Sequence, residues 1–103
     1  MTLARTMALD LGMPVHAAYL EMAEPSIPVT MRAAVAAGAM RIVTVPYFLT
    51  AGMHVRRDLV EIVDAAREEL AVTIELSGFL GSHPELPRLL TDITRAALSM
   101  RSA

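Results

Sequence analysis

The chain has 103 residues, a net charge of −2 and no cysteine. This length suits one domain with a single core, and it excludes two domains. Apolar residues make up 54% of the chain, which argues against intrinsic disorder, and the lack of a Lys/Arg block argues against nucleic-acid binding. Without thiols the chain has neither disulfides nor thiolate metal sites, and this composition suits the reducing cytoplasm.

The first segments predict a helix and a strand. Leu3, Met7 and Leu11 are spaced four apart and define one apolar helix face, which Gly12 ends. Residues 15–20 then have the pattern of a short strand. The charges of the N-terminal segment and its lack of a long apolar core argue against a signal peptide.

A second helix and a buried strand follow. Ser26 is suited to cap the helix, Pro28 fits its first turn, and Gly38 follows its end. Residues 40–49 are apolar on both alternating faces, as in a parallel sheet covered on both sides. This apolar run contains Pro46 and falls well short of the roughly 20 residues that span a bilayer, so we expect a soluble protein without a membrane partner.

The remaining chain continues the alternation. Residues 55–70 have helical spacing, residues 72–76 have β-branched strand content, residues 78–82 form a loop, and residues 84–100 have helical spacing again. The order of elements predicts an α/β fold, a three-layer sandwich around a parallel sheet with right-handed crossovers.

Three polar side chains follow the three predicted strands. Glu21, His54 and His83 would all lie at the carboxyl edge of the sheet, where open parallel sheets bind ligands. A carboxylate with imidazoles suits borderline divalent metals, and the carboxylate can also accept protons.

Each candidate also has a structural interpretation. His54 could simply satisfy amides at a helix start, whereas a capping role is favoured for His83, which we leave out of the site. His16 is interpreted as a core or sheet-face histidine, and Glu24 as part of a turn.

The residues around His54 allow similar alternatives. Arg56, Arg57 and Asp58 are either an exposed helix turn or, in the case of the arginines, binding groups for carboxylates. Nearby apolar side chains could line a pocket or pack in the core: Met53, Tyr47 and Phe48.

Three segments carry a family resemblance: YLEMAEPSIP, GAMRIVTVPYFLTAGMHVRRDL and GFLGSHPELPRLL. Together they resemble the CbiX-type sirohydrochlorin chelatases, the small class II tetrapyrrole chelatases. The resemblance implies insertion of Co²⁺ or Fe²⁺ into sirohydrochlorin, a macrocycle with eight carboxylates, for cobalamin or sirohaem biosynthesis. The sequence does not choose between cobalt, iron and nickel, because the same ligands serve each metal.

The resemblance also implies roles for residues. The family's metal-handling histidine falls on His54 and its acidic partner on Glu21. No organic cofactor is implied, and a homodimer is expected. Contacts to the macrocycle and its carboxylates are assigned on general physical grounds to five residues: Arg56, Arg57, Met53, Tyr47 and Phe48.

The chain departs from the family pattern at its start. Family members begin with a strand that ends in Gly-His-Gly-Ser, and this motif with its second histidine is absent here. We therefore expect residues 1–103 to be an N-terminally shortened chelatase-like domain that lacks the family's first strand. In-frame upstream sequence would encode that strand, and a stop codon directly before Met1 would contradict this hypothesis.

Two other functions remain as alternatives. The chain could be a noncatalytic remnant of the family that binds a tetrapyrrole or a metal without completing insertion. A flavodoxin-like phosphate binder is disfavoured, because the sequence has no GxGxxG or Walker-type loop.

Overall fold

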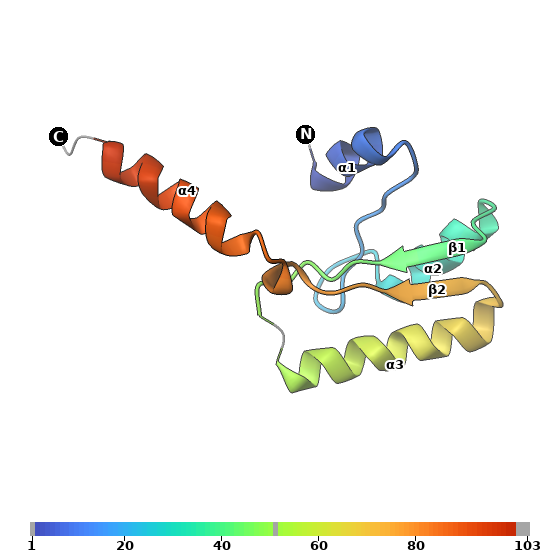
Figure 1. Cartoon of the computed structure of the whole chain (residues 1–103). Helices are drawn as coiled ribbons and strands as arrows, with labels where there is room; N and C mark the ends of the chain where they lie inside the picture. The colour runs from blue at the N-terminus through green and yellow to red at the C-terminus, as the bar shows by residue number, and fades with distance from the viewer. Residues whose placement is uncertain (1, 51, 101–103) are drawn as a thin grey trace.

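The computed structural model describes residues 2–50 and 52–100. These residues form helices on both sides of a small sheet (Figure 1). In chain order the elements are α1 (Leu3–Leu11), α2 (Ile27–Ala36), β1 (Arg41–Thr44), α3 (Met53–Leu70), β2 (Thr73–Leu76), the 3-10 turn η1 (Leu80–Ser82) and α4 (Leu86–Ser99).

Local sequence signals set the ends of the first two helices. The Thr2 hydroxyl accepts a hydrogen bond from the Arg5 N–H, and α1 ends at Gly12, which has a left-handed φ of 68°. The Ser26 hydroxyl accepts from the Val29 N–H at 3.4 Å and so caps α2. These bonds satisfy amides that a helix leaves free at its start, and both helices were predicted at these positions.

The sheet consists of two parallel strands. Their register pairs Arg41 with Thr73 and Thr44 with Leu76. At the end of the ladder the Ser77 N–H donates to the Thr44 carbonyl at 2.9 Å. Among the described residues β1 has no second strand neighbour, so its other edge is unpaired.

The strand predicted at residues 15–20 is not formed. Only Tyr19 pairs, in an isolated bridge to Ser26, and its N–H donates to the Pro25 carbonyl at 2.9 Å. An extended segment becomes a strand only when a neighbouring strand satisfies its amides and carbonyls, and this segment does not reach the free edge of β1. The prediction was therefore wrong in that part of the chain.

The predicted strand at residues 40–49 is shorter than expected and is covered on one face only. It ends at Thr44, because β2 offers four residues for pairing and Pro46 has no N–H to donate. Val43 and Val45 are half exposed, whereas Ile42 packs against the core. The α/β class and the parallel sheet are nevertheless as predicted.

The core lies between α2, α3 and one face of the sheet. The amphipathic helix α3 supplies its centre, with Val63 only 1% exposed, as the helical spacing predicted. Six residues are buried in this cluster: Ile27, Met31, Leu59, Val63, Ala66 and Ile74.

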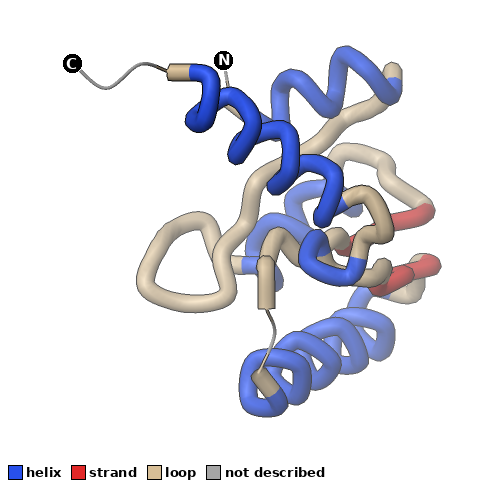
Figure 2. The backbone as a smooth tube through the Cα atoms, turned by 60° about the vertical axis from the view of Figure 1, so that its left-hand side comes forward, coloured by secondary structure: helices blue, strands red, loops and turns tan. Residues whose placement is uncertain are grey.

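The outer helices contribute little to the core. Figures 1 and 2 show α1 and α4 on the opposite side of the strands from α3, and neither helix has a buried residue. The radius of gyration is 16.7 Å, against about 13 Å for a compact domain of this size. None of the described helices is long and apolar enough to cross a membrane.

Truncating Met31 to alanine tests the position of the core. Met31 is 4% exposed, so we expect the free energy of unfolding in urea to fall by about 2–5 kcal/mol. The matched control is Met40→Ala, because the side chain of Met40 is 82% exposed. This substitution should change the free energy of unfolding by less than about 0.5 kcal/mol. Equal effects of the two substitutions would contradict this core.

Candidate functional site

The loops after β1 and β2 are joined by backbone hydrogen bonds. The Leu80 N–H donates to the Pro46 carbonyl at 3.2 Å, and the Gly81 N–H donates to the Phe48 carbonyl at 2.9 Å. A Cβ atom at position 81 would collide with the carbonyl of Leu49, so this approach requires glycine. Residues 46–48, which follow β1, are thereby held against η1 at the carboxyl edge of the sheet.

His54 lies in the first turn of α3, which begins at Met53 and not at Val55 as predicted. Its side chain is 76% exposed and is held at both ring nitrogens. Nε2 lies 3.2 Å from Asp58 Oδ2, and Nδ1 lies 3.1 Å from Arg57 Nη2. Neither contact was predicted, although the His-x-x-x-Asp spacing on a helix indicates the one between His54 and Asp58.

Glu21 lines a groove of about 420 Å³ between α2 and α3. The same groove is lined by Asp58, the residue that contacts His54. Asp58 therefore links the two residues expected to handle the metal, because it contacts His54 and lines the same groove as Glu21. Glu61 also lines the groove and adds a further carboxylate to it.

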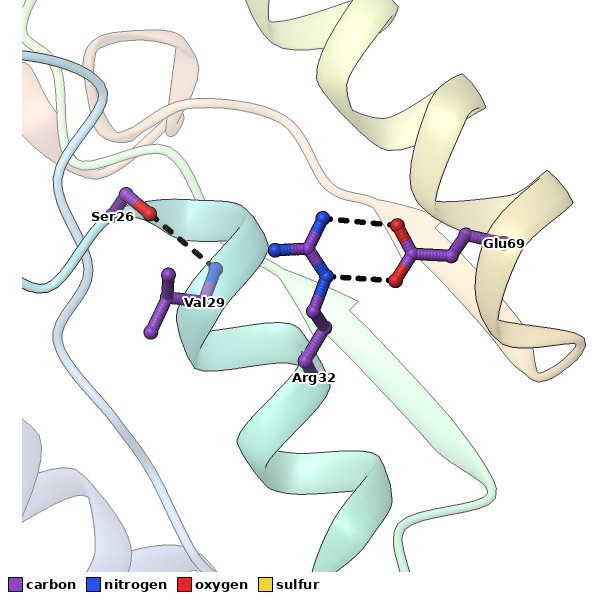
Figure 3. Close-up of polar contacts among 4 residues, drawn as sticks. All are labelled: Ser26, Val29, Arg32 and Glu69. Carbon is purple, nitrogen blue, oxygen red and sulfur yellow. Dashed lines mark hydrogen bonds and ion pairs between the residues drawn. The ribbon is translucent and has the colours of Figure 1, made fainter.

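At the other end of this groove an arginine side chain neutralises a carboxylate. Arg32 on α2 forms two hydrogen bonds to the Glu69 carboxylate, at 2.7 and 3.0 Å (Figure 3). Hydrogen bonding to Arg32 lowers the pKa of Glu69, and its charge acts in the same direction. The bidentate pair joins α2 to α3 and keeps that carboxylate ionised.

A second, apolar pocket of about 230 Å³ adjoins the sheet edge. Phe48 and Arg56 line it, and the Arg56 guanidinium lies 5.6 Å from the ring centroid of Phe79. Sequence reasoning missed Phe79, although it follows Gly78 in a loop already placed at this edge. Tyr47 and Met53 do not line this pocket and are 70% and 88% exposed.

The other histidines lie outside the site. His83 Nδ1 accepts a hydrogen bond from the Glu85 N–H at 3.0 Å, which supports the predicted local capping role. His16 is exposed in an irregular segment, so its interpretation as a core or sheet-face residue was wrong. The cause is the unformed strand at residues 15–20, which leaves no sheet face to cover it.

The structure brings together few metal-ligating side chains. Within residues 2–50 and 52–100 no group of three or more His, Asp or Glu residues is placed to hold a metal ion. A resident metal normally has four or more ligands, so the described residues do not form a closed structural metal site.

Comparison with known proteins identifies the family. The sequence model of the CbiX family matches residues 1–97. The chain belongs to the CbiX family. A crystal structure described as a cobalamin (vitamin B12) biosynthesis CbiX protein, from Marinobacter aquaeolei VT8, is similar with a TM-score of 0.75 and 30% identity, over 91% of this chain and 81% of that one.

Two curated proteins are similar to this CbiX-family chain in sequence. Sirohydrochlorin ferrochelatase of Arabidopsis thaliana, a chloroplastic protein, is 35% identical over 82% of this chain. Sirohydrochlorin cobaltochelatase of Methanocaldococcus jannaschii is 42% identical over 44% of it. The matched regions span only 38% and 32% of those two proteins.

The Arg32–Glu69 pair predicts a specific pH response. The pKa of Glu69 is lower in the folded protein than its usual value of 4.5. The pair therefore contributes its full stability when the pH is above 4.5, and this contribution is lost as the pH falls through the pKa of the folded state. In Arg32→Gln we expect the pKa of Glu69 to rise toward 4.5, measured by NMR titration of its side-chain carbon. The matched control is Arg41→Gln, which should instead raise the pKa of Glu75, the bidentate partner of Arg41. An unmoved Glu69 pKa in Arg32→Gln would contradict the pairing.

Proposed function

We propose that this chain acts as a sirohydrochlorin chelatase domain, inserting Co²⁺ or Fe²⁺ into sirohydrochlorin in cobalamin or sirohaem biosynthesis. The observation that supports the proposal is the contact of His54 with Asp58, a carboxylate that also lines the groove of Glu21. Membership of the CbiX family and the names of the similar curated proteins support the same reaction.

The proposed reaction is an exchange of one divalent cation for two protons. The two pyrrole N–H groups of the macrocycle each lose a proton, and their nitrogens then bind the metal. His54 carries the incoming metal or accepts a pyrrole proton, and Glu21 accepts a proton and offsets the metal's charge. The macrocycle supplies four nitrogen ligands to the metal. A protein site with few ligands is suited to this reaction, because it must release the metal to the macrocycle.

The substrate is proposed to lie across the carboxyl edge of the sheet. Arg56 and Arg57 bind peripheral carboxylates, which match the planar guanidinium in geometry and charge. The flat macrocycle contacts apolar side chains at this edge, for which we propose Phe48, Tyr47 and Met53. The reaction needs no organic cofactor, and we place it in the cytoplasm, where a chain without cysteine is well suited.

Replacement of His54 by alanine tests this function. Insertion of Co²⁺ into sirohydrochlorin is followed by visible absorption, and we expect the rate to fall at least about 100-fold, the usual scale for loss of a proton-transferring group. His16→Ala, at an exposed histidine outside the site, is the matched control and should keep the parent rate. Binding of the macrocycle without turnover by the parent would favour the noncatalytic alternative, and equal rates for parent, His54→Ala and the protein-free blank would overturn the proposal.

We propose that two copies of the chain pair through their outer helices. The apolar face of α4 leaves large side chains between 51% and 66% exposed: Leu89, Leu90 and Ile93. Exposed apolar surface of this extent usually marks an interface in soluble proteins.

Sedimentation equilibrium tests the pairing. We expect twice the monomer mass of 11.1 kDa for the parent and a monomer for Ile93→Glu, which puts a charge on the apolar face of α4. Thr91→Glu adds the same charge on the polar side of the helix and should remain a dimer. A monomeric parent at micromolar concentration would exclude the dimer.

A further inference from the structure

The two contacts of the His54 ring define its neutral tautomer. A guanidinium group only donates hydrogen bonds, so the nitrogen that faces Arg57 must accept. That nitrogen is Nδ1, at 3.1 Å from Arg57 Nη2. Nε2 then carries the hydrogen and lies 3.2 Å from the Asp58 carboxylate, which can only accept. One arrangement of protons satisfies both neighbours, with the lone pair of His54 on Nδ1.

We propose that His54 presents Nδ1 to the metal, that Asp58 holds the tautomer that makes this possible, and that Arg57 covers Nδ1 until a carboxylate of the tetrapyrrole draws the guanidinium away. Asp58 and Arg57 are positioning residues in this scheme. The inference deepens the proposed chelatase function and depends on it for the identity of the carboxylate.

Ligation through the other nitrogen conflicts with the neighbours of the ring. A metal on Nε2 would displace the Asp58 carboxylate, and the hydrogen would have to move to Nδ1, where it would face the donor groups of Arg57. Ligation through Nδ1 keeps the contact between Nε2 and Asp58. The result is the carboxylate–histidine–metal arrangement that raises the basicity of a histidine ligand.

The position of Arg57 makes metal binding conditional on the substrate. A cation close to Nδ1 repels a divalent metal and occupies the lone pair that would bind it. A carboxylate offers Arg57 a stronger, bidentate partner than an imidazole does, so the guanidinium moves when the macrocycle arrives. Both side chains are exposed and lie at the start of α3, so this movement disturbs no packing. The tetrapyrrole would therefore bind before the metal.

The tautomer is measured by long-range ¹H–¹⁵N NMR of the histidine side chains, with His54→Gln used for assignment. We expect the Nε2–H form to dominate at His54 in the parent. In Asp58→Ala we expect a mixture of both tautomers, because the acceptor for the Nε2 hydrogen is lost. Glu61→Ala removes a carboxylate that lines the same groove and should leave the tautomer unchanged. A dominant Nδ1–H form in the parent, or an unchanged tautomer in Asp58→Ala, would overturn the role of Asp58.

The covering role of Arg57 is measured with Zn²⁺ alone as a diamagnetic probe. We expect Arg57→Gln to bind Zn²⁺ at His54 roughly 10-fold more tightly than the parent. Zn²⁺ binding should change the ¹⁵N chemical shift of Nδ1 of His54. Arg56→Gln removes the same charge from the neighbouring residue, which stacks on Phe79, and should stay close to the parent. Equal affinities of the two variants, no Zn²⁺ binding by Arg57→Gln, or a shift change at Nε2 would overturn the proposal.

These measurements contain no tetrapyrrole. They can therefore fail while the chelatase assay succeeds, in which case His54 acts in the reaction without this control by Arg57. Conversely, the chelatase assay can fail while the tautomer and the Zn²⁺ affinities are as expected. In that case the proposed metal-binding geometry at His54 stands and the proposed chelatase reaction is rejected.

Discussion

The parallel backbone ladder between β1 and β2 is the interaction on which the rest of the structure depends. It continues beyond the strands, where the amides of Leu80 and Gly81 donate to carbonyls of the loop after β1. These bonds bring the segments after β1 and β2 together at the carboxyl edge of the sheet. Within residues 2–50 and 52–100 β1 pairs on one edge only, so loss of this ladder would leave the strand without a partner.

The core and the site share one helix, and this links stability to chemistry. The inner face of α3 carries Leu59, Val63 and Ala66 into the core, while its first two turns carry His54 and the residues that contact it. An α-helix is stiff over this length, so packing in the middle of α3 holds the ring at its end. The groove beside α3 is lined by several carboxylates, which favour the approach of a divalent cation.

Local signals predicted much of the fold. The cap at Ser26 and the left-handed residue Gly12 act within a few residues of the helices they bound, so the sequence alone locates them. The strand expected at residues 15–20 depends on a partner that the pattern of one segment does not contain, and it did not form. The carboxyl-edge rule predicted that the loops after β1 and β2 meet, and backbone hydrogen bonds join them. The same rule does not place Glu21, because the strand expected before it is not formed. Long-range pairs such as Arg56 with Phe79 join two separate loops, and periodicity carries no information about them.

The projecting helix α4 changes how the molecule moves in solution. With extents of 56 × 32 × 26 Å, the chain is elongated and has a larger hydrodynamic radius than a sphere of equal mass. Its friction is correspondingly high, so a monomer would elute early from a sizing column and resemble a larger particle. Methods that weigh the particle directly are free of this error, and only they separate an elongated single copy from a compact pair.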